Sequence, residues 1–455
     1  MFGRKKKKTS GLPALNSRIS LPKNRSGATK TNHKGRPDWP ILAVAVFLTL
    51  FGLLMIFSAS AFLSLQNKDF NYDLFYIFNR HIIWIIIGTV LAFIIYKMPI
   101  LSLRKLSIVA IFVLLAIMIY MVPEALSSVI DVQTGRKAIE LPLVNTLNNG
   151  TRWIDLGIFD MQPAEFIKIP IIIFSAYWFT LGEKEKKRID DFLKKYKDKE
   201  FLHLILSTGA YLIPFIILGL IVLLVLTQRD LDSAVVIALP VIAIYFAATT
   251  SKQQVYTLLG ILFVGFIAGY LLITQQDYRK ERFDAYTQII VDGQPDLKVQ
   301  ADNGYQAWNG LIAIGSGGLF GKGYNESRQK FYYLQEAAYT DSIFAVTAEE
   351  FGLAGSLAIM LGFLYLGSRG FKNAAESSSK FESLIIIGIT TWIISQAFLN
   401  IAANLSLIPF AGMPLPFFSY GGSNTLMILL GIGLMLKLSR KNISSRDNPL
   451  FRRRV

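Results

Sequence analysis

The sequence contains no cysteine, only three histidines and few charged residues among its 455 positions. Without cysteine the chain cannot form disulfides, thiolate nucleophiles or cysteine-ligated metal sites. His33, His81 and His203 lie far apart and lack the spacing of metal ligands on one helix. Charged residues make up 17% of the chain, and hydrophobic residues make up 53%. This composition argues against an ordinary soluble globular protein and predicts a polytopic membrane protein.

The apolar segments predict an all-α fold with about ten membrane-spanning helices. A spanning helix needs about 20 largely apolar residues. The expected spans are residues 40–63, 78–96, 106–122, 163–181, 205–226, 233–250, 255–274, 342–367, 383–404 and 422–436. Together they make one membrane domain over residues 40–436. A basic tail at 1–39, expected to be disordered, precedes this domain, and a second basic tail at 437–455 follows it.

The distribution of Lys and Arg predicts the orientation of the chain. Residues 1–39 hold 11 of these cations, residues 182–200 hold 8, and the tail from Lys437 holds 7. An even number of spans places these segments on one side, and the positive-inside rule makes that side the cytoplasm. The net charge of +16 is therefore explained by topology and needs no nucleic-acid partner.

Three loops are then expected outside the cytoplasm. They cover residues 64–77, 123–162 and 275–341, and the last is the largest. Loops longer than about 15 residues are usually functional or disordered. The aromatic residues of the 275–341 loop favour order, so this loop is where we expect chemistry at the outer face.

Prolines and glycines interrupt the chain between the last two expected spans. Pro409, Pro414, Pro416, Gly412, Gly421 and Gly422 all fall between positions 409 and 423. Broken backbone at membrane depth survives only where it is buried in protein or lines a polar cavity. This segment, which also contains Ser419, predicts a ligand site near the membrane surface. A tight loop between two spans is the simpler alternative.

Asp341 directly precedes the apolar run of the eighth expected span. An acid at a helix start is common and is often a helix cap. At the membrane boundary beneath an ordered outer loop, the same carboxylate would suit a general base that activates a hydroxyl.

Glu349 and Glu350 follow Asp341 by about two helical turns. Adjacent acids at that depth in a membrane are costly and suggest a functional site. The expected partner is Lys168, which also forms an i, i+3 pair with Glu165 in the fourth expected span. A structural ion network is the alternative to a direct role.

Cations are also present in the expected outer loops. Arg152 next to Trp153 combines an anion-binding group with an interfacial aromatic residue. Arg282 and Lys330 lie in the 275–341 loop and suggest an anionic ligand such as a pyrophosphate, although solvated loop charges are the alternative. The Gly-rich segment 314–323 could hold a phosphate through its backbone N–H groups, but it is not a Walker motif.

These motifs, taken in order, resemble the SEDS (shape, elongation, division and sporulation) family over most of residues 40–440. The matching motifs are Ser58-Ala-Ser60, Asn149-Gly-Thr-Arg-Trp153, Gln162-Pro-Ala-Glu165 with Lys168, Gly304-Tyr-Gln306, Gly315-Ser-Gly-Gly-Leu319, Thr340-Asp341 with Glu349-Glu-Phe-Gly352, and Pro414-Leu-Pro-Phe-Phe-Ser-Tyr-Gly-Gly-Ser423. Residues 325–330, residues 400–404 and the basic N-terminal tail resemble the division-type branch. The chain departs from the family pattern at 228–232, at Ala164, Ala411 and Asn424, and in the approach to Asp341.

The resemblance implies an inverting peptidoglycan glycosyltransferase that polymerises lipid II at the outer face of a bacterial cytoplasmic membrane, at the division septum. It assigns Asp341 as the catalytic base. The residues expected to contact substrate are Arg152, Trp153, Gln162, Glu165, Lys168, Arg282, Gln306, Lys330, Glu349, Glu350, Ser419, Gly421 and Gly422.

The resemblance also implies partners and leaves a cofactor open. The expected partners are a class B penicillin-binding protein and other divisome or elongasome membrane proteins. A divalent cation (Mg²⁺ or Mn²⁺) could offset the pyrophosphate charge, whereas nothing points to a nucleotide, haem or flavin. The alternatives are an elongation-type polymerase, a lipid II flippase or transporter, and a noncatalytic scaffold for a partner synthase.

Overall fold

The computed structural model describes residues 36–134, 139–147, 150–157, 159–181, 213–248, 260, 283–284, 286–292, 304–409 and 412–440. Of the predicted features, the span at 255–274 lies outside the described residues apart from Gly260, and Arg282 and most of both basic tails also lie outside them.

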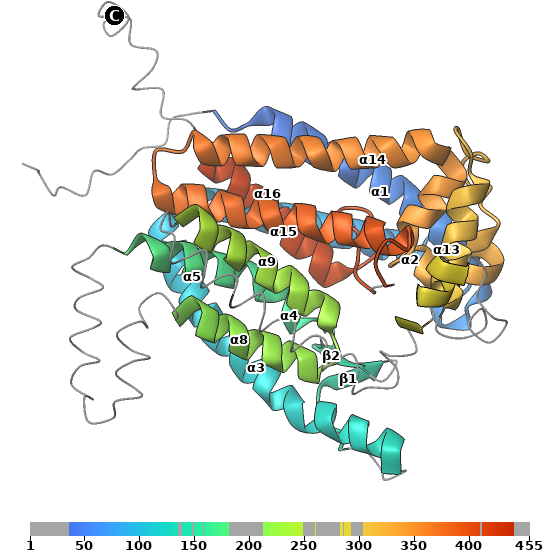
Figure 1. Ribbon diagram of the computed structural model, residues 1–455, viewed down its shortest axis with the longest axis horizontal. Coiled ribbons are helices and arrows are strands. Elements are labelled where there is room, and N and C mark those ends of the chain that lie inside the picture. Colours follow the sequence, from blue (N-terminus) through green and yellow to red (C-terminus); the bar gives the residue numbers. More distant parts are fainter. Residues whose placement is uncertain are drawn as a thin grey trace, which may run out of the picture. The chain divides into compact units, whose positions relative to one another are not determined.

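Long apolar helices dominate the described part of the chain (Figure 1). The six that are long and apolar enough to cross a membrane are α1 (Trp39–Gln66), α2 (Tyr76–Lys97), α3 (Ile100–Thr134), α9 (Leu231–Ala248), α14 (Ile343–Ala375) and α15 (Lys380–Asn404). Two shorter apolar helices are α8 (Ile213–Thr227) and α16 (Gly422–Leu438). The chain is therefore a multi-pass helical membrane protein, while the count of ten spans and the side of the termini stay predictions.

The fourth expected span is not one continuous helix. Residues 163–181 form α4 (Pro163–Phe166) and α5 (Lys168–Thr180), separated at Ile167. Pro170 explains the interruption, because proline has no N–H to donate to the carbonyl four residues earlier.

A small sheet corrects the all-α prediction. Strands β1 (Val144–Leu147), β2 (Gly150–Asp155) and β3 (Asp160–Met161) pair antiparallel in the order β1-β2-β3. In addition, α3 continues well past the predicted end of its span at residue 122. Its Glu124 accepts hydrogen bonds from the Leu141 N–H and the Thr146 hydroxyl. The predicted 123–162 loop is thus largely ordered, and it carries Arg152 and Trp153 on β2.

Helix α14 is interrupted at Gly352, whose backbone adopts φ 64° and ψ −158°. The segment after α13 (Tyr305–Ser316) fills the break. The N–H groups of Lys322 and Gly323 donate to the carbonyls of Glu349 and Glu350, and Leu353 N–H donates to Gly318. The freed backbone groups of the broken helix therefore bond to protein rather than face lipid.

Short helical turns complete the described elements. The 3₁₀ helix η1 (Lys68–Phe70) follows α1, and η3 (Gln288–Asp292) is a π-helical turn. The π-helical turn η4 (Lys330–Leu334) and the 3₁₀ helix η5 (Gln335–Ala338) lead directly into α14.

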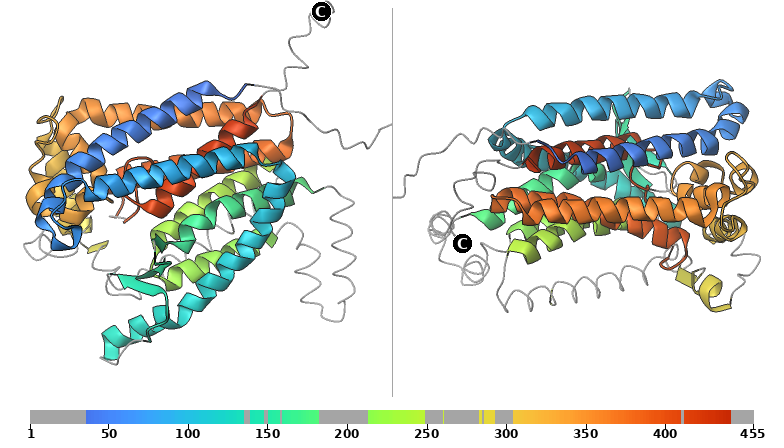
Figure 2. Two further views of the ribbon diagram at one scale, coloured as in Figure 1. Left: turned by 180° about the vertical axis from the view of Figure 1, so that it is seen from behind. Right: turned by 90° about the horizontal axis from the view of Figure 1, so that it is seen from above.

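Helix α15 lies at the centre of the packing. It contacts α9, α14 and α5, and it is the most enclosed of the six long helices. Helix α16 packs along α2, as both views in Figure 2 show. Trp392 of α15 and Phe344 of α14 are among the largest fully buried side chains of the core. Phe418, from the broken segment at 412–421, is also fully buried and packs in the same core.

Candidate active site

A cavity of about 240 Å³ collects half of the predicted site residues. They come from β2, the α4–α5 pair, the start of α14 and the broken segment before α16. The predicted residues that line the cavity are Arg152, Trp153, Gln162, Glu165, Lys168, Asp341 and Gly421. The others in its lining are Asp230, Ser233, Val236, Thr340, Gln396, Gly412, Met413, Pro414, Tyr420, Ser423 and Asn424.

Asp341 lies at the N-terminal end of α14, one residue before the N-cap Ser342. Its side chain is half-buried, and Gly412 packs so closely that a Cβ on that glycine would lie 3.3 Å from Asp341 Oδ2. The Gly412 N–H donates to Asp232 at the start of α9 with a distance of 3.0 Å. Helix α9 therefore holds the broken segment against the carboxylate.

The predicted residue Ser419 lies beside the cavity rather than in its lining. Its hydroxyl donates to the Thr340 carbonyl (2.6 Å) and accepts from the Leu415 N–H (2.7 Å). The next residue, Tyr420, donates its N–H to the Tyr339 carbonyl (2.8 Å). Ser419 is thus placed to hold the backbone before Asp341.

Lys168 and Glu165 form the predicted i, i+3 ion pair, with 2.6 Å between Lys168 Nζ and Glu165 Oε1. Both side chains are almost fully buried. The ammonium also donates to Gln396 Oε1 (3.2 Å) and lies 5.5 Å from the ring centroid of Trp392. These contacts offset much of the cost of burying a cation.

Arg152 and Gln162 connect the sheet side of the cavity to the start of α9. Arg152 Nη2 donates to the Arg229 carbonyl (2.5 Å), and Gln162 Nε2 donates to Asp230 Oδ2 (3.0 Å). Asp230 Oδ1 accepts from the Ser233 N–H, which is a helix-capping contact. One carboxylate thus caps α9 and orients Gln162.

Tyr420 adds a neutral group to the lining. Burial raises the pKa of its phenol, and burial likewise raises the pKa of Tyr339. The Tyr420 hydroxyl therefore stays protonated near neutral pH and can donate a hydrogen bond. The carboxylates of the cavity remain the groups suited to accept a proton.

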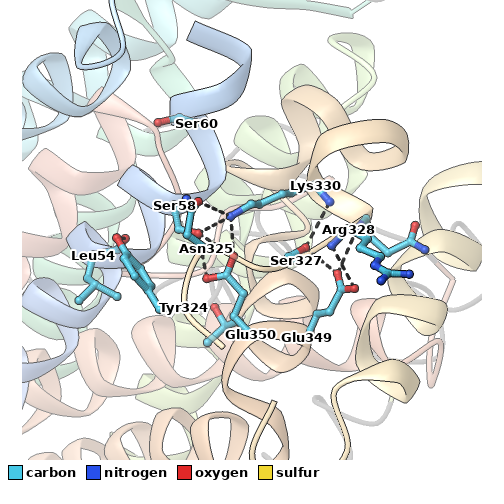
Figure 3. A network of polar contacts seen from close by, with 12 residues as sticks. Leu54, Ser58, Ser60, Tyr324, Asn325, Ser327, Arg328, Lys330, Glu349 and Glu350 are labelled. Atoms are coloured by element: carbon cyan, nitrogen blue, oxygen red, sulfur yellow. Dashed lines mark hydrogen bonds and ion pairs between the residues drawn. The ribbon is translucent and has the colours of Figure 1, made fainter. Parts of the chain in front are cut away.

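Lys330 and Glu350 belong to a second cluster. Lys330 Nζ donates to Glu350 Oε1, Ser58 Oγ and Asn325 Oδ1 at 2.6 to 2.7 Å. Figure 3 shows the ammonium between Ser58 of α1 and Glu350 of α14. Burial lowers the pKa of Lys330, and the Glu350 carboxylate partly offsets this effect. The cluster connects the segment between α13 and α14 to the helices α1 and α14.

The expected pairing of Glu349 and Glu350 with Lys168 is wrong. Glu349 instead accepts from Lys322 Nζ (2.5 Å), the Ser327 hydroxyl (2.5 Å) and two backbone N–H groups. The prediction failed because it treated the eighth span as one continuous helix, whereas α14 breaks at Gly352 and the segment after α13 packs into the break beside these acids.

The last three N–H groups of the Gly-rich segment are not available to a phosphate. The N–H groups of Gly321, Lys322 and Gly323 donate to carbonyls of Gly317, Glu349 and Glu350. These donors are used within the protein, so the glycines serve close backbone packing instead. A Cβ on Gly321 would come within 2.1 Å of the Glu350 carbonyl oxygen.

Two other predicted residues are not in the cavity lining. Gln306 is half-buried on α13. Gly422 begins α16 against Trp84, where a Cβ would lie 2.4 Å from the indole ring. Among the described residues, no group of three His, Asp or Glu side chains is arranged to hold a metal ion.

Sequence reasoning missed Asp230 and Gln396 as cavity residues. Asp230 falls in the 228–232 segment, which stands out only as a departure from the family pattern. Gln396 lies within an apolar span, and a buried amide there is a detectable signal because burying an unpaired amide is costly. Asp230 bonds to Gln162 and Gln396 bonds to Lys168, and both of these partners are distant in the sequence.

The chain is similar to known proteins over most of its length. Residues 38–444 match the family described as Cell cycle protein, FtsW/RodA/SpoVE. A probable peptidoglycan glycosyltransferase FtsW from Geobacter sulfurreducens is 31% identical over 407 residues, which cover 89% of this chain and 96% of that protein. Stage V sporulation protein E from Bacillus subtilis is 31% identical over 414 residues, covering 90% and 99%.

Two solved structures share the fold at 20% identity. One comes from a study of structural coordination of polymerization and crosslinking by a peptidoglycan synthase complex; it has a TM-score of 0.62 and covers 89% of this chain and 98% of its own. The other is the rod shape determining protein RodA of Thermus thermophilus, with a TM-score of 0.56 and coverage of 89% and 97%. The residues that match the family model include all of the described helices. The chain therefore belongs to the FtsW/RodA/SpoVE family.

Proposed function

We propose that this protein is a peptidoglycan glycosyltransferase that polymerises lipid II at the outer face of the cytoplasmic membrane, for septal wall synthesis in cell division. Membership of the family and the names of its relatives support the activity. The observation that carries the proposal is the cavity itself, which places the Asp341 carboxylate together with the Arg152 and Lys168 cations.

The proposed reaction uses Asp341 as a general base. Its carboxylate takes the proton of the acceptor sugar's 4-hydroxyl, and that oxygen attacks the anomeric carbon of the lipid-linked donor. The bond from this carbon to the pyrophosphate oxygen breaks with inversion, and the electron pair leaves with undecaprenyl pyrophosphate. One base with stabilisation of the leaving group suffices for an inverting transfer. Arg152 and Lys168 would supply positive charge for the pyrophosphate.

A divalent cation stays a proposal: no group of three His, Asp or Glu side chains among the described residues is arranged to hold one, so one or two cavity carboxylates and the substrate's pyrophosphate would have to bind it. The cations of the chain itself, Arg152 and Lys168, would supply charge stabilisation with or without such an ion. The proposed membrane partner is a class B penicillin-binding protein, and the structural neighbour from a peptidoglycan synthase complex supports a partner of this kind.

A lipid flippase is the second candidate, favoured by the break in α14 beside two buried acids. Broken helices with internal charges are common at transporter binding sites. Here, however, the backbone carbonyls of Glu349 and Glu350 accept hydrogen bonds from other parts of the protein, and so do both of their carboxylates. This arrangement favours a rigid element over a moving gate.

The test is glycan-chain formation from purified lipid II by the detergent-solubilised protein with its transpeptidase partner. Asp341→Asn is compared with wild type and with Asp69→Asn, which removes an exposed carboxylate in η1. We expect polymer from wild type and Asp69→Asn, and none from a folded, partner-bound Asp341→Asn. Equal polymer from all three would remove Asp341 as the base, and polymer from none would favour transport or scaffolding.

A further inference from the structure

Three amide side chains form a buried row on α15. Gln396, Asn400 and Asn404 are spaced four residues apart and therefore share one face of the helix. Each is at most 1% exposed. Burying three amides in an apolar helix is costly unless each finds hydrogen-bond partners. We call these residues the amide row.

The partners of Gln396 fix the orientation of its amide. Its Oε1 accepts from Lys168 Nζ (3.2 Å) and from Trp392 Nε1 (2.8 Å). Both of these groups can only donate, so the oxygen must face them. The Nε2 group consequently faces the broken segment and donates to the Pro414 carbonyl (3.0 Å) and to Asn424 Oδ1 (2.9 Å). Gln396 thus connects the cavity's ammonium to the backbone at Pro414.

Asn400 repeats this bridging one turn along the helix. Its Nδ2 group donates to the carbonyl of Asp341 (2.9 Å) and to that of Met413 (2.7 Å). Asn404 Nδ2 donates to the same Asp341 carbonyl (3.0 Å). A carbonyl oxygen has two lone pairs, so the backbone of Asp341 uses both as acceptors from one helix.

The two preceding carbonyls are held as well. Tyr339 accepts from the Tyr420 N–H, and Thr340 accepts from the Ser419 hydroxyl. Three consecutive carbonyls that end at Asp341 are therefore bonded to α15 or to the broken segment. Asp341 lies outside the helical hydrogen bonds of α14, so these contacts replace the restraint that a helix would give.

We propose that Gln396, Asn400 and Asn404 are positioning residues for the proposed glycosyl transfer. The amide row holds the base Asp341, the cation Lys168 and the segment at 413–414 in one geometry, and none of its three residues needs to touch the reacting atoms. This inference rests on the proposed function. Its physical basis is the strict geometry of proton abstraction, in which a displacement of about 1 Å can lower a rate by about 100-fold.

The test measures kcat and KM for lipid II polymerisation by the full-length protein with its partner. Asn400→Asp keeps the side-chain size but turns an acceptor oxygen toward the carbonyls of Asp341 and Met413. We expect kcat to fall by about 10- to 100-fold with KM within about threefold of wild type. The pH profile of kcat should also shift, because Asp341 would occupy a different environment. Asn373→Asp is the matched control. Asn373 is also a buried amide, but it lies on α14 rather than α15 and does not line the cavity.

Asn404→Ala provides a milder second variant, because Asn400 would still donate to the Asp341 carbonyl. We expect a smaller fall in kcat, about three- to tenfold, and an effect that is not additive with Asn400→Ala since both amides share one acceptor. Folded, partner-bound variants with wild-type kcat and pH profile would overturn the inference, as would effects no larger than that of Asn373→Asp. If Asn400→Asp does not fold, Asn404→Ala alone decides.

The two proposals fail in distinguishable ways. Full activity of Asp341→Asn would remove the proposed base, and the inference with it. Loss of activity in Asp341→Asn, combined with normal kinetics in the amide-row variants, would overturn only the positioning role.

Discussion

Lys330 and Glu350 form an ion pair that is almost completely enclosed, with 2.6 Å between Nζ and Oε1 and side-chain exposures of 1% and 0%. Ser58 of α1 bonds to both members, donating to the carboxylate and accepting from the ammonium. The pair thus joins η4, α1 and the part of α14 that precedes Gly352. A buried pair of this kind is costly to disrupt one partner at a time.

Removing only the cation of this pair should strongly destabilise the protein. Lys330→Met leaves the Glu350 carboxylate buried without its counter-charge, for which we expect a loss of about 3 to 5 kcal/mol. Thermal unfolding of the detergent-solubilised protein would measure the loss. The double variant Lys330→Met with Glu350→Gln should recover part of it, because no unpaired charge remains.

Lys322→Met is the matched control for this prediction. Lys322 pairs with Glu349 but its side chain is 32% exposed, and Glu349 keeps Ser327 and two backbone N–H partners. We expect a loss of about 1 kcal/mol or less. Equal destabilisation by the two lysine substitutions would contradict the expectation that the enclosed pair contributes more stability than the partly exposed one.

Gly352→Ala should prevent stable folding of α14 around its break at residue 352. The φ of 64° with ψ of −158° is a conformation that is open essentially only to glycine, and a Cβ there would lie 2.4 Å from the Gly321 nitrogen. Gly315→Ala is the control, since it lies within α13 with open space around it and should be neutral or slightly stabilising. Folded yield and melting temperature would check both, and unchanged stability of Gly352→Ala would contradict the strained break.

Composition predicted the helical membrane architecture because long apolar runs have few other stable arrangements. The i, i+3 spacing predicted the Glu165 and Lys168 pair, which forms although the two residues lie in α4 and α5 on either side of Ile167. The partner of Glu349 and Glu350 was predicted wrongly from their expected depth in a continuous eighth span, because the helix breaks at Gly352 and the segment after α13 supplies their cations.

The contacts of the amide row could not be predicted from sequence patterns. Asn400 and Asn404 bond to a carbonyl about 60 residues away, and Gln396 bonds to Lys168 on another helix. No local periodicity encodes such contacts, which depend on how α15 packs against α5 and α14. Likewise, the three-stranded sheet is formed by short strands inside a segment that lacked a spanning-helix pattern.

Gly412→Ala should impair catalysis while leaving the fold intact. The added methyl group would lie 3.3 Å from Asp341 Oδ2, and the backbone at Gly412 does not have a positive φ that would exclude alanine. The methyl would occupy space beside the carboxylate that an acceptor hydroxyl needs, so we expect polymerisation to fall by about tenfold or more. The measurement is kcat and KM with purified lipid II, together with melting temperature.

Gly219→Ala, which places a methyl group in open space on α8, is the matched control and should keep normal activity. A Gly412→Ala variant that melts like wild type and polymerises as fast would show that the acceptor does not approach Asp341 from the side of Gly412. A stable but slow Gly412→Ala variant would instead place the reacting hydroxyl between the broken segment and the start of α14. The amide row bonds to the backbone of both of these segments.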